Sequence, residues 1–291
     1  MRKKIQPFSV VNGVILTLLM IICLYPFLYV IFASFSDPWE LVRHNGVLLH
    51  PLGFSLEGYK SVLENRSIIT GYINTLINLF GGTTLNIILT LLAAYAVSRK
   101  KFLLKKPVTV MIIFTMFFNS GIIPRFLVVR DLGLYDNRLA MILPTAINVF
   151  NLVIMKTAIE QLPDSLEEAA VIEGANDFDI LFKIVVPLIK STIAVLVLYY
   201  GVAHWNQWYQ ALMYIQDRDK FPLQLILREI LIGNSVESMA AGGVDSSGET
   251  AVIGEVIKYA TIVVSTVPIL AIYPLLQKHF VKGVMVGAVK G

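Results

Sequence analysis

Long apolar runs, separated by short polar segments, dominate the hydrophobic pattern of this chain. A helix needs about 20 apolar residues to cross a bilayer. Five runs approach or exceed this length and a sixth is plausible; together they cover roughly residues 11–35, 72–97, 108–129, 139–159, 190–213 and 257–277. Only helices and closed barrels span lipid, because unpaired backbone groups are costly there, and continuous runs of this length favour helices. The pattern therefore predicts an all-α membrane protein with six transmembrane helices in a single domain, residues 1–291.

The composition agrees with a membrane protein. Of the 291 residues, 56% are hydrophobic and 15% are charged, and the mean hydropathy is +0.71. Such a chain is too apolar for a soluble globule. Cys23 is the one cysteine, so no disulfide framework or cysteine metal site is expected. His44, His50, His204 and His279 lack the spacing of metal ligands.

The basic residues fall on one side of the predicted membrane. They precede the first run, fill the link between the second and third runs, and follow the sixth: Arg2, Lys3, Lys4, Arg99, Lys100, Lys101, Lys105, Lys106, Lys278, Lys282 and Lys290. By the positive-inside rule both termini are cytoplasmic, and this orientation explains the basic balance without a nucleic-acid partner. On the opposite side, segment 36–71 is expected to be a packed loop. Segment 214–256 is expected to open with a short amphipathic helix after Pro222.

A polar hairpin, residues 161–190, interrupts the apolar pattern on the predicted cytoplasmic side. Ser165 to Glu168 has the form of a capping box, in which the serine caps backbone donors and the glutamate reaches back. Gly174 permits the left-handed conformation that ends a helix. Asn176 or Asp177 can cap the helix that follows. The segment therefore predicts two short helices with a break at Gly174.

The second helix of this hairpin is expected to carry an apolar stripe, and Pro187 marks the return to the membrane. The stripe consists of Phe178, Ile180, Leu181 and Ile184. Small Ala169, Ala170 and Gly174 would let a partner protein approach the backbone, and Phe178 could fill an apolar cleft. The alternative is a hairpin that stabilises only its own chain.

The residues of the hairpin resemble the EAA loop of ABC-importer permeases. The chain has Glu168-Ala169-Ala170, three residues, Gly174, nine residues, Ile184, one residue and Val186-Pro187, with Val186 where leucine is usual. The resemblance implies the type I importer permease fold, whose hairpin enters a groove of the ATP-binding subunit as a coupling helix. The implied coupling residues are Glu168, Ala169, Ala170, Gly174, Ala175, Phe178, Ile184 and Pro187.

Other segments are similar to the carbohydrate branch of this family: Trp205-Asn206, Phe221-Pro-Leu and the tail Val281–Gly291. The resemblance implies import of a carbohydrate across the bacterial cytoplasmic membrane. An oligosaccharide is the favoured cargo, and it could be an acidic oligosaccharide that contains uronate. The implied partners are a homologous, non-identical second permease, a dimer of ABC ATPases and an external solute-binding protein. The chain has no Gly-x4-Gly-Lys-Ser/Thr loop, so ATP and Mg are expected on the partner ATPase.

Amides and aromatic residues in the predicted spans are the candidates for a sugar path, because amides pair with hydroxyls and aromatic faces pack on sugar rings. The candidates are Asn74, Asn78, Asn119, Asn148, Asn151, Trp205, Asn206, Trp208 and Tyr209. The alternatives are an interfacial aromatic belt and asparagines that bond neighbouring helices. Arg125, Arg130 and Arg138 either favour an acidic sugar or simply flank their helices, and flanking is favoured.

Two other classes of function fit six helices. An ion-coupled secondary transporter would need charged groups inside the membrane, and the predicted spans contain almost none. A membrane scaffold that binds an ATPase without moving a solute is the second alternative. The sequence predicts no catalytic residue, so the chain is expected not to be an enzyme.

Overall fold

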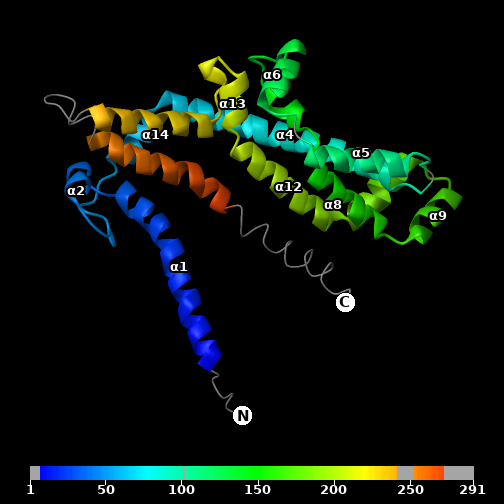
Figure 1. The fold of residues 1–291 in the computed structure, drawn as a ribbon, viewed down its shortest axis with the longest axis horizontal. Helices are drawn as coiled ribbons and strands as arrows, with labels where there is room; N and C mark the ends of the chain where they lie inside the picture. The colour runs from blue at the N-terminus through cyan, green and yellow to red at the C-terminus, as the bar shows by residue number, and fades with distance from the viewer. Residues whose placement is uncertain (1–6, 101, 119, 241–251, 272–291) are drawn as a thin grey trace. The chain divides into compact units, whose positions relative to one another are not determined.

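The computed structural model describes residues 7–100, 102–118, 120–240 and 252–271, and these residues form helices and connecting segments without a strand (Figure 1). The chain divides into two compact units. Unit 1 comprises residues 1–69 and 227–268, and unit 2 comprises residues 70–226 and 269–291. The single domain expected from the sequence stays a prediction.

Six segments of the described chain are long and apolar enough to cross a membrane. Three are continuous helices: Phe8–Ser34, Arg66–Ser98 and Val252–Ala271. Three are pairs of helices with a bend between them: Lys105–Phe117 with Ile122–Asp131, Leu139–Thr145 with Val149–Glu160, and Asp177–Leu188 with Lys190–Trp205. The six predicted spans are therefore present, but the third, fourth and fifth are broken rather than straight.

Unit 1 contains the first helix and the segment that follows it. Its elements are α1 (Pro7–Ser34), α2 (Pro38–Arg43), α3 (Glu57–Glu64), the first residues of α4 (Arg66–Ser98), the later part of α14 (Leu223–Ala240) and most of the helix Val252–Ala271. Asp37 caps α2 by accepting from the backbone N–H groups of Trp39 and Glu40. The hydroxyls of Ser34 and Tyr59 lie 2.8 Å apart. The packed loop predicted over 36–71 is confirmed.

The helix predicted after Pro222 is longer than expected. It runs as α14 from Leu223 to Ala240, and the polar stretch 241–248 lies outside the described residues. The last predicted span begins earlier, at Val252, and residues 272–277 of it are also outside the described part.

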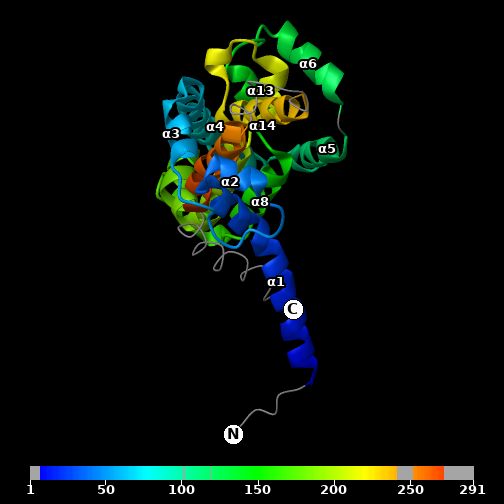
Figure 2. The same ribbon diagram turned by 90° about the vertical axis from the view of Figure 1, so that its left-hand side faces the viewer.

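Unit 2 contains most of α4 and the helical elements from α5 to η3. These are α5 (Lys105–Phe117), α6 (Ile122–Asp131), α7 (Leu139–Ile142), η1 (Leu143–Thr145), α8 (Val149–Glu160), α9 (Asp164–Ile172), α10 (Asp177–Asp179), η2 (Ile180–Val185, a π-helix), α11 (Val186–Leu188), α12 (Lys190–Trp205), α13 (Tyr209–Tyr214) and η3 (Arg218–Lys220). Helix α6 runs in a different direction from α5 (Figures 1 and 2). Gly121, with φ +82°, occupies the position before α6.

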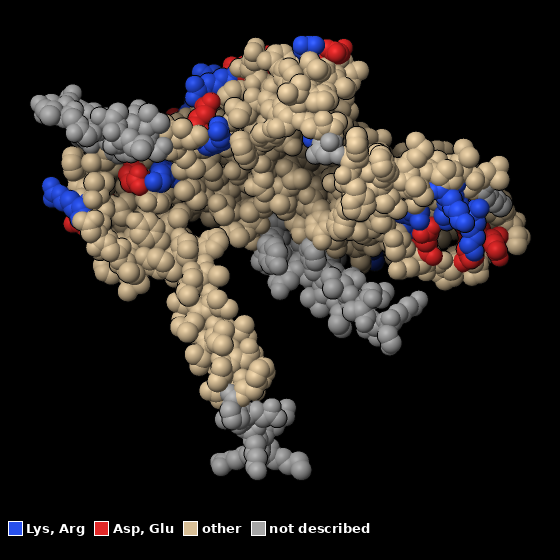
Figure 3. Space-filling model, viewed as in Figure 1, with Lys and Arg blue, Asp and Glu red and all other residues tan. Residues whose placement is uncertain are grey.

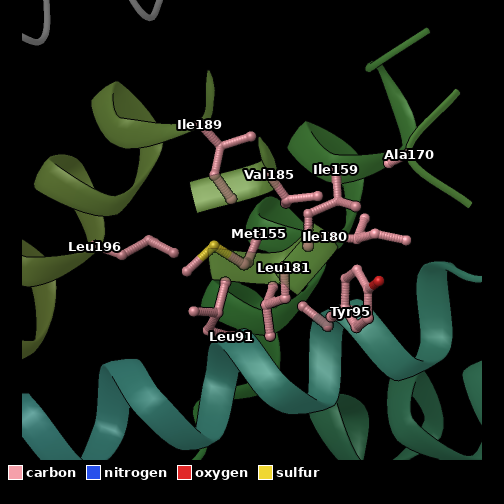
Figure 4. Packing of buried hydrophobic residues seen from close by; sticks show 11 residues of the cluster. Leu91, Tyr95, Met155, Ile159, Ala170, Ile180, Leu181, Val185, Ile189 and Leu196 are labelled. Atoms are coloured by element: carbon pink, nitrogen blue, oxygen red, sulfur yellow. The ribbon is translucent and has the colours of Figure 1, made fainter. Parts of the chain in front are cut away.

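The largest core of unit 2 joins α4, α8, the hairpin and α12. Leu91 and Tyr95 of α4 meet Met155 and Ile159 of α8, and hairpin residues complete the cluster from the other side (Figure 4). Close packing of this kind transmits displacement, because protein interiors are dense and compress little.

Asp136 ties together the two loops that follow α6 and α13. It has φ +56°, and its Oδ1 accepts from the backbone N–H groups of Gln216 and Asp217, each at 3.1 Å. Lys220 Nζ donates to the backbone oxygen of Asp136 at 2.9 Å. These hydrogen bonds hold the pKa of the Asp136 carboxyl below its usual value, and the bond from the Asp217 backbone N–H has the largest effect.

Candidate functional site: a helical hairpin and a polar cavity

The first helix of the hairpin, α9, ends in a Schellman motif built on Gly174. Gly174 has φ +85°. Its N–H donates to Val171 O at 3.0 Å, and the N–H of Ala175 donates to Ala170 O at 2.9 Å. These two bonds satisfy carbonyls at the helix end, and the left-handed conformation predicted for Gly174 is confirmed. A Cβ added to Gly174 would meet no atom within 4 Å, so the surface there is open.

The predicted capping box at Ser165 is wrong. Helix α9 begins at Asp164, two residues before the start that a cap at Ser165 implies, with Pro163 at the cap position and no side-chain capping bond. Asp164 instead pairs with Lys100. At the second helix the predicted cap is confirmed, because Asn176 Oδ1 accepts from Asp179 N at 2.9 Å.

The predicted hairpin residues divide between a buried face and an exposed tip. Ala170, Ile180 and Leu181 are buried in the core, and Ala175 and Ile184 pack against it. The exposed residues are Glu168, Ala169, Gly174, Phe178 and Pro187. The predicted apolar stripe therefore includes Ile180, Leu181 and Ile184 but not Phe178. Phe178 precedes Ile180 by two residues, which is about 200° around an α-helix.

Exposed apolar side chains gather at the tip beside Gly174. Ile172 is 86% exposed and Phe178 is 67% exposed, and Val171 is also exposed. An exposed apolar group in a charged segment indicates a contact surface. The sequence analysis missed Val171 and Ile172, although two large apolar residues after Glu168-Ala169-Ala170 were a visible sign. The tip has the small and apolar character that a protein-docking surface needs.

Ion pairs connect the hairpin to the link between α4 and α5. Arg99 pairs with Glu167 and Lys100 with Asp164, both on α9. Basic and acidic side chains gather at the end of unit 2 that carries α9 (Figure 3). The basic residues that the sequence assigned to the cytoplasmic side therefore also position the hairpin.

Glu160, at the end of α8, extends this ionic network. It accepts from Lys105 Nζ at 2.7 Å and from Lys156 Nζ at 2.8 Å. Lys105 also donates to the backbone oxygen of Ser98 at 3.0 Å. The start of α5, the end of α4 and the end of α8 are thus fastened together beside the hairpin.

Two adjoining polar cavities lie elsewhere in unit 2. The larger, of about 530 Å³, lies among α5, α6, η1 and α8. The smaller, of about 280 Å³, lies between the α8 region and α12. Both are lined by Thr145, Asn148 and Phe150. The two cavities therefore adjoin at these three residues.

The break between η1 and α8 places Asn148 at this cavity. Asn86 Nδ2 donates to Thr145 O at 2.8 Å and to Ala146 O at 3.0 Å, so the carbonyls freed at the end of η1 are satisfied. Asn148 Oδ1 then caps α8 by accepting from Asn151 N at 3.1 Å. The two halves of this segment meet at 52°.

Helix α12 forms the other wall. The Tyr200 hydroxyl accepts from Asn148 N at 3.0 Å and lies 2.7 Å from Thr90 Oγ1. His204 Nε2 lies 3.0 Å from Asn86 Oδ1. His204 Nδ1 lies 3.4 Å from Gln207 Oε1, so both ring nitrogens face amide oxygens.

Among the predicted path residues, the structure places Asn148 and Asn151 in the cavity wall. Asn74 and Asn78 are buried elsewhere. Asn74 Nδ2 donates to Asp219 O and Phe221 O, and its Oδ1 accepts from Arg138, so it serves loop packing. Asn78 Nδ2 lies 3.8 Å from Met141 Sδ. Asn119 lies outside the described residues.

The predicted aromatic candidates do not line the polar cavity. Trp205 is buried edge-on against Tyr72, and it lines an apolar hollow of about 390 Å³. Asn206 is exposed and donates to Val202 O at 2.9 Å. Trp208 and Tyr209 are exposed and pack edge-to-face against each other. Neither lines the polar cavity, although Gln207 and Gln210 beside them in sequence do.

The cavity wall further contains Asn86, Tyr199, Tyr200, His204, Gln207 and Gln210, and of these the sequence analysis missed Tyr199, Tyr200 and Gln210. A helical pattern could have found part of this set. Tyr200, His204 and Gln207 follow one another at spacings of four and three residues, which places them on one face of a helix.

A multi-span helical protein with an exposed polar hairpin and a polar cavity is typical of the membrane-transport class. The chain belongs to the family described as binding-protein-dependent transport system inner membrane component, whose family profile matches residues 86–286.

Two proteins of Bacillus subtilis (strain 168) are similar over nearly the whole chain. The polygalacturonan/rhamnogalacturonan transport system permease protein YtcP is 42% identical over 93% of this chain and 94% of its own length. Protein LplC is 38% identical over 98% of this chain and 95% of its own length. A chain in the crystal structure of a bacterial ABC transporter involved in import of the acidic polysaccharide alginate has a TM-score of 0.85 and 32% identity, covering 94% of this chain and 96% of that one. The recognised family and the helical permease fold are thereby confirmed.

Proposed function

We propose that this chain is one of two permease subunits of an ATP-driven importer, and that it forms the path for an oligosaccharide with a homologous, non-identical second permease. The hairpin carries the proposal. Its tip exposes Ile172 and Phe178 beside open Gly174, while its other face is buried in the core of unit 2. The relatives named for polysaccharide transport support the choice of cargo.

The hairpin tip docks on a partner ATPase, which binds ATP and Mg. Closure of the ATPase dimer pushes the tip, and the displacement reaches the core through Ile180 and Leu181. Leu196 of α12 belongs to the same core, and Tyr200, four residues further on, lines the polar cavity. Residues four apart share a helix face, so one rigid helix joins the core to the cavity.

The cavity offers neutral hydrogen-bonding groups and aromatic faces to a saccharide. Asn148 and Gln210 supply amides, and Tyr199 supplies a ring and a hydroxyl. Saccharide hydroxyls both donate and accept, as amides do. The chain binds and passes its cargo without a covalent step, and an external solute-binding protein delivers it.

The charges around the hairpin also support our proposal that both termini lie in the cytoplasm. The ion-paired basic link between α4 and α5 lies on the hairpin side, and the positive-inside rule places that side in the cytoplasm. The expected location is the bacterial cytoplasmic membrane.

Purification of the tagged chain from native membranes in mild detergent, followed by reconstitution into vesicles, tests this function. We expect a second permease and an ATPase to copurify, and saccharide uptake to require ATP and the binding protein. Uptake driven by an ion gradient without ATP would instead support a secondary transporter. Stable ATPase binding with no uptake of any saccharide would support a scaffold.

Charge and size changes at the tip test the docking role. Glu168→Lys and Gly174→Asp are expected to uncouple ATP hydrolysis from transport while the complex stays in the membrane. Glu64→Lys on α3 is the matched charge reversal at another exposed position, and it should transport normally. Normal transport by both hairpin variants would contradict the docking role.

A further inference from the structure

The two adjoining polar cavities of unit 2 have one permanent positive charge and no carboxylate among their described lining residues. Arg125 of α6 lines the larger cavity. The other lining side chains of the two cavities are neutral amides, hydroxyls, aromatic and aliphatic groups, together with His204. A cavity with a single uncompensated cation favours a cargo that carries negative charge.

Arg125 differs in its contacts from the two other arginines near it in sequence. Arg130 Nη2 donates to Asp131 Oδ1 at 3.0 Å. Arg138 Nη2 donates to Asn74 Oδ1 at 2.6 Å. Within the described residues Arg125 forms no ion pair, and it is exposed. The flanking role expected for all three arginines therefore suits Arg130 and Arg138, whereas Arg125 keeps its guanidinium available.

The surroundings of Arg125 hold the side chain beside the cavity. A second hollow, of about 380 Å³, is lined by Arg125 together with Val128, Leu132 and Leu143. Arginine packs its aliphatic stem on apolar surface of this kind and keeps its charged end in a polar environment. Arg125 lines the larger cavity together with Ser120, Thr115 and Asn148.

Neutral donors in the same cavity complement the charge. Asn148 uses its Oδ1 to cap α8, and its Nδ2 makes no hydrogen bond within the described part of the chain. Thr115 Oγ1 donates to Ile112 O at 2.7 Å and still has lone pairs to accept from a hydroxyl. An arginine for a carboxylate and neutral groups for hydroxyls are the two kinds of contact that a uronic acid needs.

We propose that Arg125 is a specificity-determining residue that binds the carboxylate of an acidic, uronate-containing saccharide in the transport path. The inference rests on the proposed function. A guanidinium matches a carboxylate with two parallel hydrogen bonds, which a neutral sugar cannot form. A carboxylate entering a membrane cavity without such a partner would lose its hydration without replacement. The alginate importer is a structural neighbour whose cargo is an acidic polysaccharide.

The test uses the complete complex in proteoliposomes with ATP inside and its binding protein outside. The acidic probe is trigalacturonate and the neutral probe is galactotriose. Uptake and ATP hydrolysis stimulated by the loaded binding protein are measured for wild type, Arg125→Gln, Arg125→Lys and the control Arg130→Gln. We expect Arg125→Gln to lower trigalacturonate uptake by roughly 10–100-fold, the range for one lost charged hydrogen-bond pair. Its stimulated ATP hydrolysis should stay within about twofold of wild type.

The retained ATP hydrolysis separates a role in the path from a role in folding or docking. Arg125→Lys should recover part of the uptake because it restores the charge without the planar fork, and Arg130→Gln should behave as wild type. Unchanged trigalacturonate uptake by Arg125→Gln would overturn the proposal, as would loss of uptake and ATP hydrolysis together.

The wild-type complex distinguishes this inference from the proposed function. ATP-dependent uptake of galactotriose without uptake of trigalacturonate would overturn the charge-selecting role and keep the importer. Absence of ATP-dependent uptake for both probes would count against the importer of oligosaccharides, and the role of Arg125 would fall with it.

Discussion

Replacement of Gly174 by alanine isolates the contribution of the hairpin break to coupling. Gly174 has φ +85°, and an added Cβ meets no atom within 4 Å. The cost therefore comes from the left-handed backbone of an L-residue alone, about 1–2 kcal/mol. A penalty of that size shifts the balance between the terminated helix and alternative conformations by roughly 5–30-fold.

Gly133 provides a control with the same local structure in another part of unit 2. It follows α6 with φ +69°, and an added Cβ there also meets nothing within 4 Å. Its N–H donates to Arg130 O at 2.9 Å, and the N–H of Leu134 donates to Val129 O at 3.1 Å. These are the same two bonds that end α9 at Gly174, so Gly133→Ala should carry a similar conformational cost.

The assay is the number of saccharide molecules imported per ATP hydrolysed in vesicles, with thermal unfolding measured in parallel. Both variants should lose similar stability, but only Gly174→Ala should lower the transport ratio, by severalfold. An unchanged ratio in Gly174→Ala, at a measurable loss of stability, would refute the view that the shape of the break matters for coupling. An equal fall in both variants would assign the effect to stability.

Three further changes test the packing and the charges of unit 2. Gly82→Ala should destabilise the permease by about 1–3 kcal/mol, because the new Cβ would lie 2.5 Å from the His204 ring; Gly81→Ala, whose Cβ meets nothing, should unfold at the wild-type temperature or above. Glu160→Gln should cost about 1 kcal/mol, since Lys105 and Lys156 lose a shared carboxylate, and a lower denaturation midpoint would show it. Asp136→Asn should lower the unfolding temperature at pH 6–8. Because the folded pKa of Asp136 is depressed, its contribution is present above the unfolded value of about 3.9 and lost as pH falls through the folded pKa. The difference from wild type should therefore vanish in acid, and a difference that grew in acid would contradict this assignment.

The hydrophobic pattern was sufficient to locate the six apolar segments, because span length depends only on consecutive apolar residues. The ends of the hairpin helices were also local properties: Gly174 needs no distant contact to turn left-handed, and Asn176 caps the helix that it precedes. The start of α9 was misjudged by two residues, since Pro163 and not Ser165 occupies the cap position.

The breaks inside the spans could not be predicted from hydropathy, because a bent apolar segment and a straight one have the same hydropathy. The carbonyls of Thr145 and Ala146 are satisfied by Asn86, which is 59 and 60 residues away in sequence. The apolar pattern around the break gives no sign of that partner. The cavity depends on this long-range contact, so Asn148 was predicted as a path residue while its surroundings were not.

Residue type alone also misplaced several path candidates. Trp205 and Asn74 have the chemistry of sugar-binding side chains, yet both are buried against other elements. Arg125 was grouped with Arg130 and Arg138, and only their contacts separate them. Tertiary contacts decide which polar side chains remain free for a ligand.

The π-helix Ile180–Val185 decides how the hairpin responds to a change in its length. A π-turn accommodates one residue more than an α-turn, and the segment lies between the tip and the 84° bend before Lys190. Deleting one residue there would leave a regular α-turn, and the helix on either side would keep its rotational setting. Deleting one residue from a regular α-turn would instead rotate everything before the deletion by about 100°. The hairpin can therefore lose one residue within the π-helix without turning Gly174 and Phe178 to a new direction.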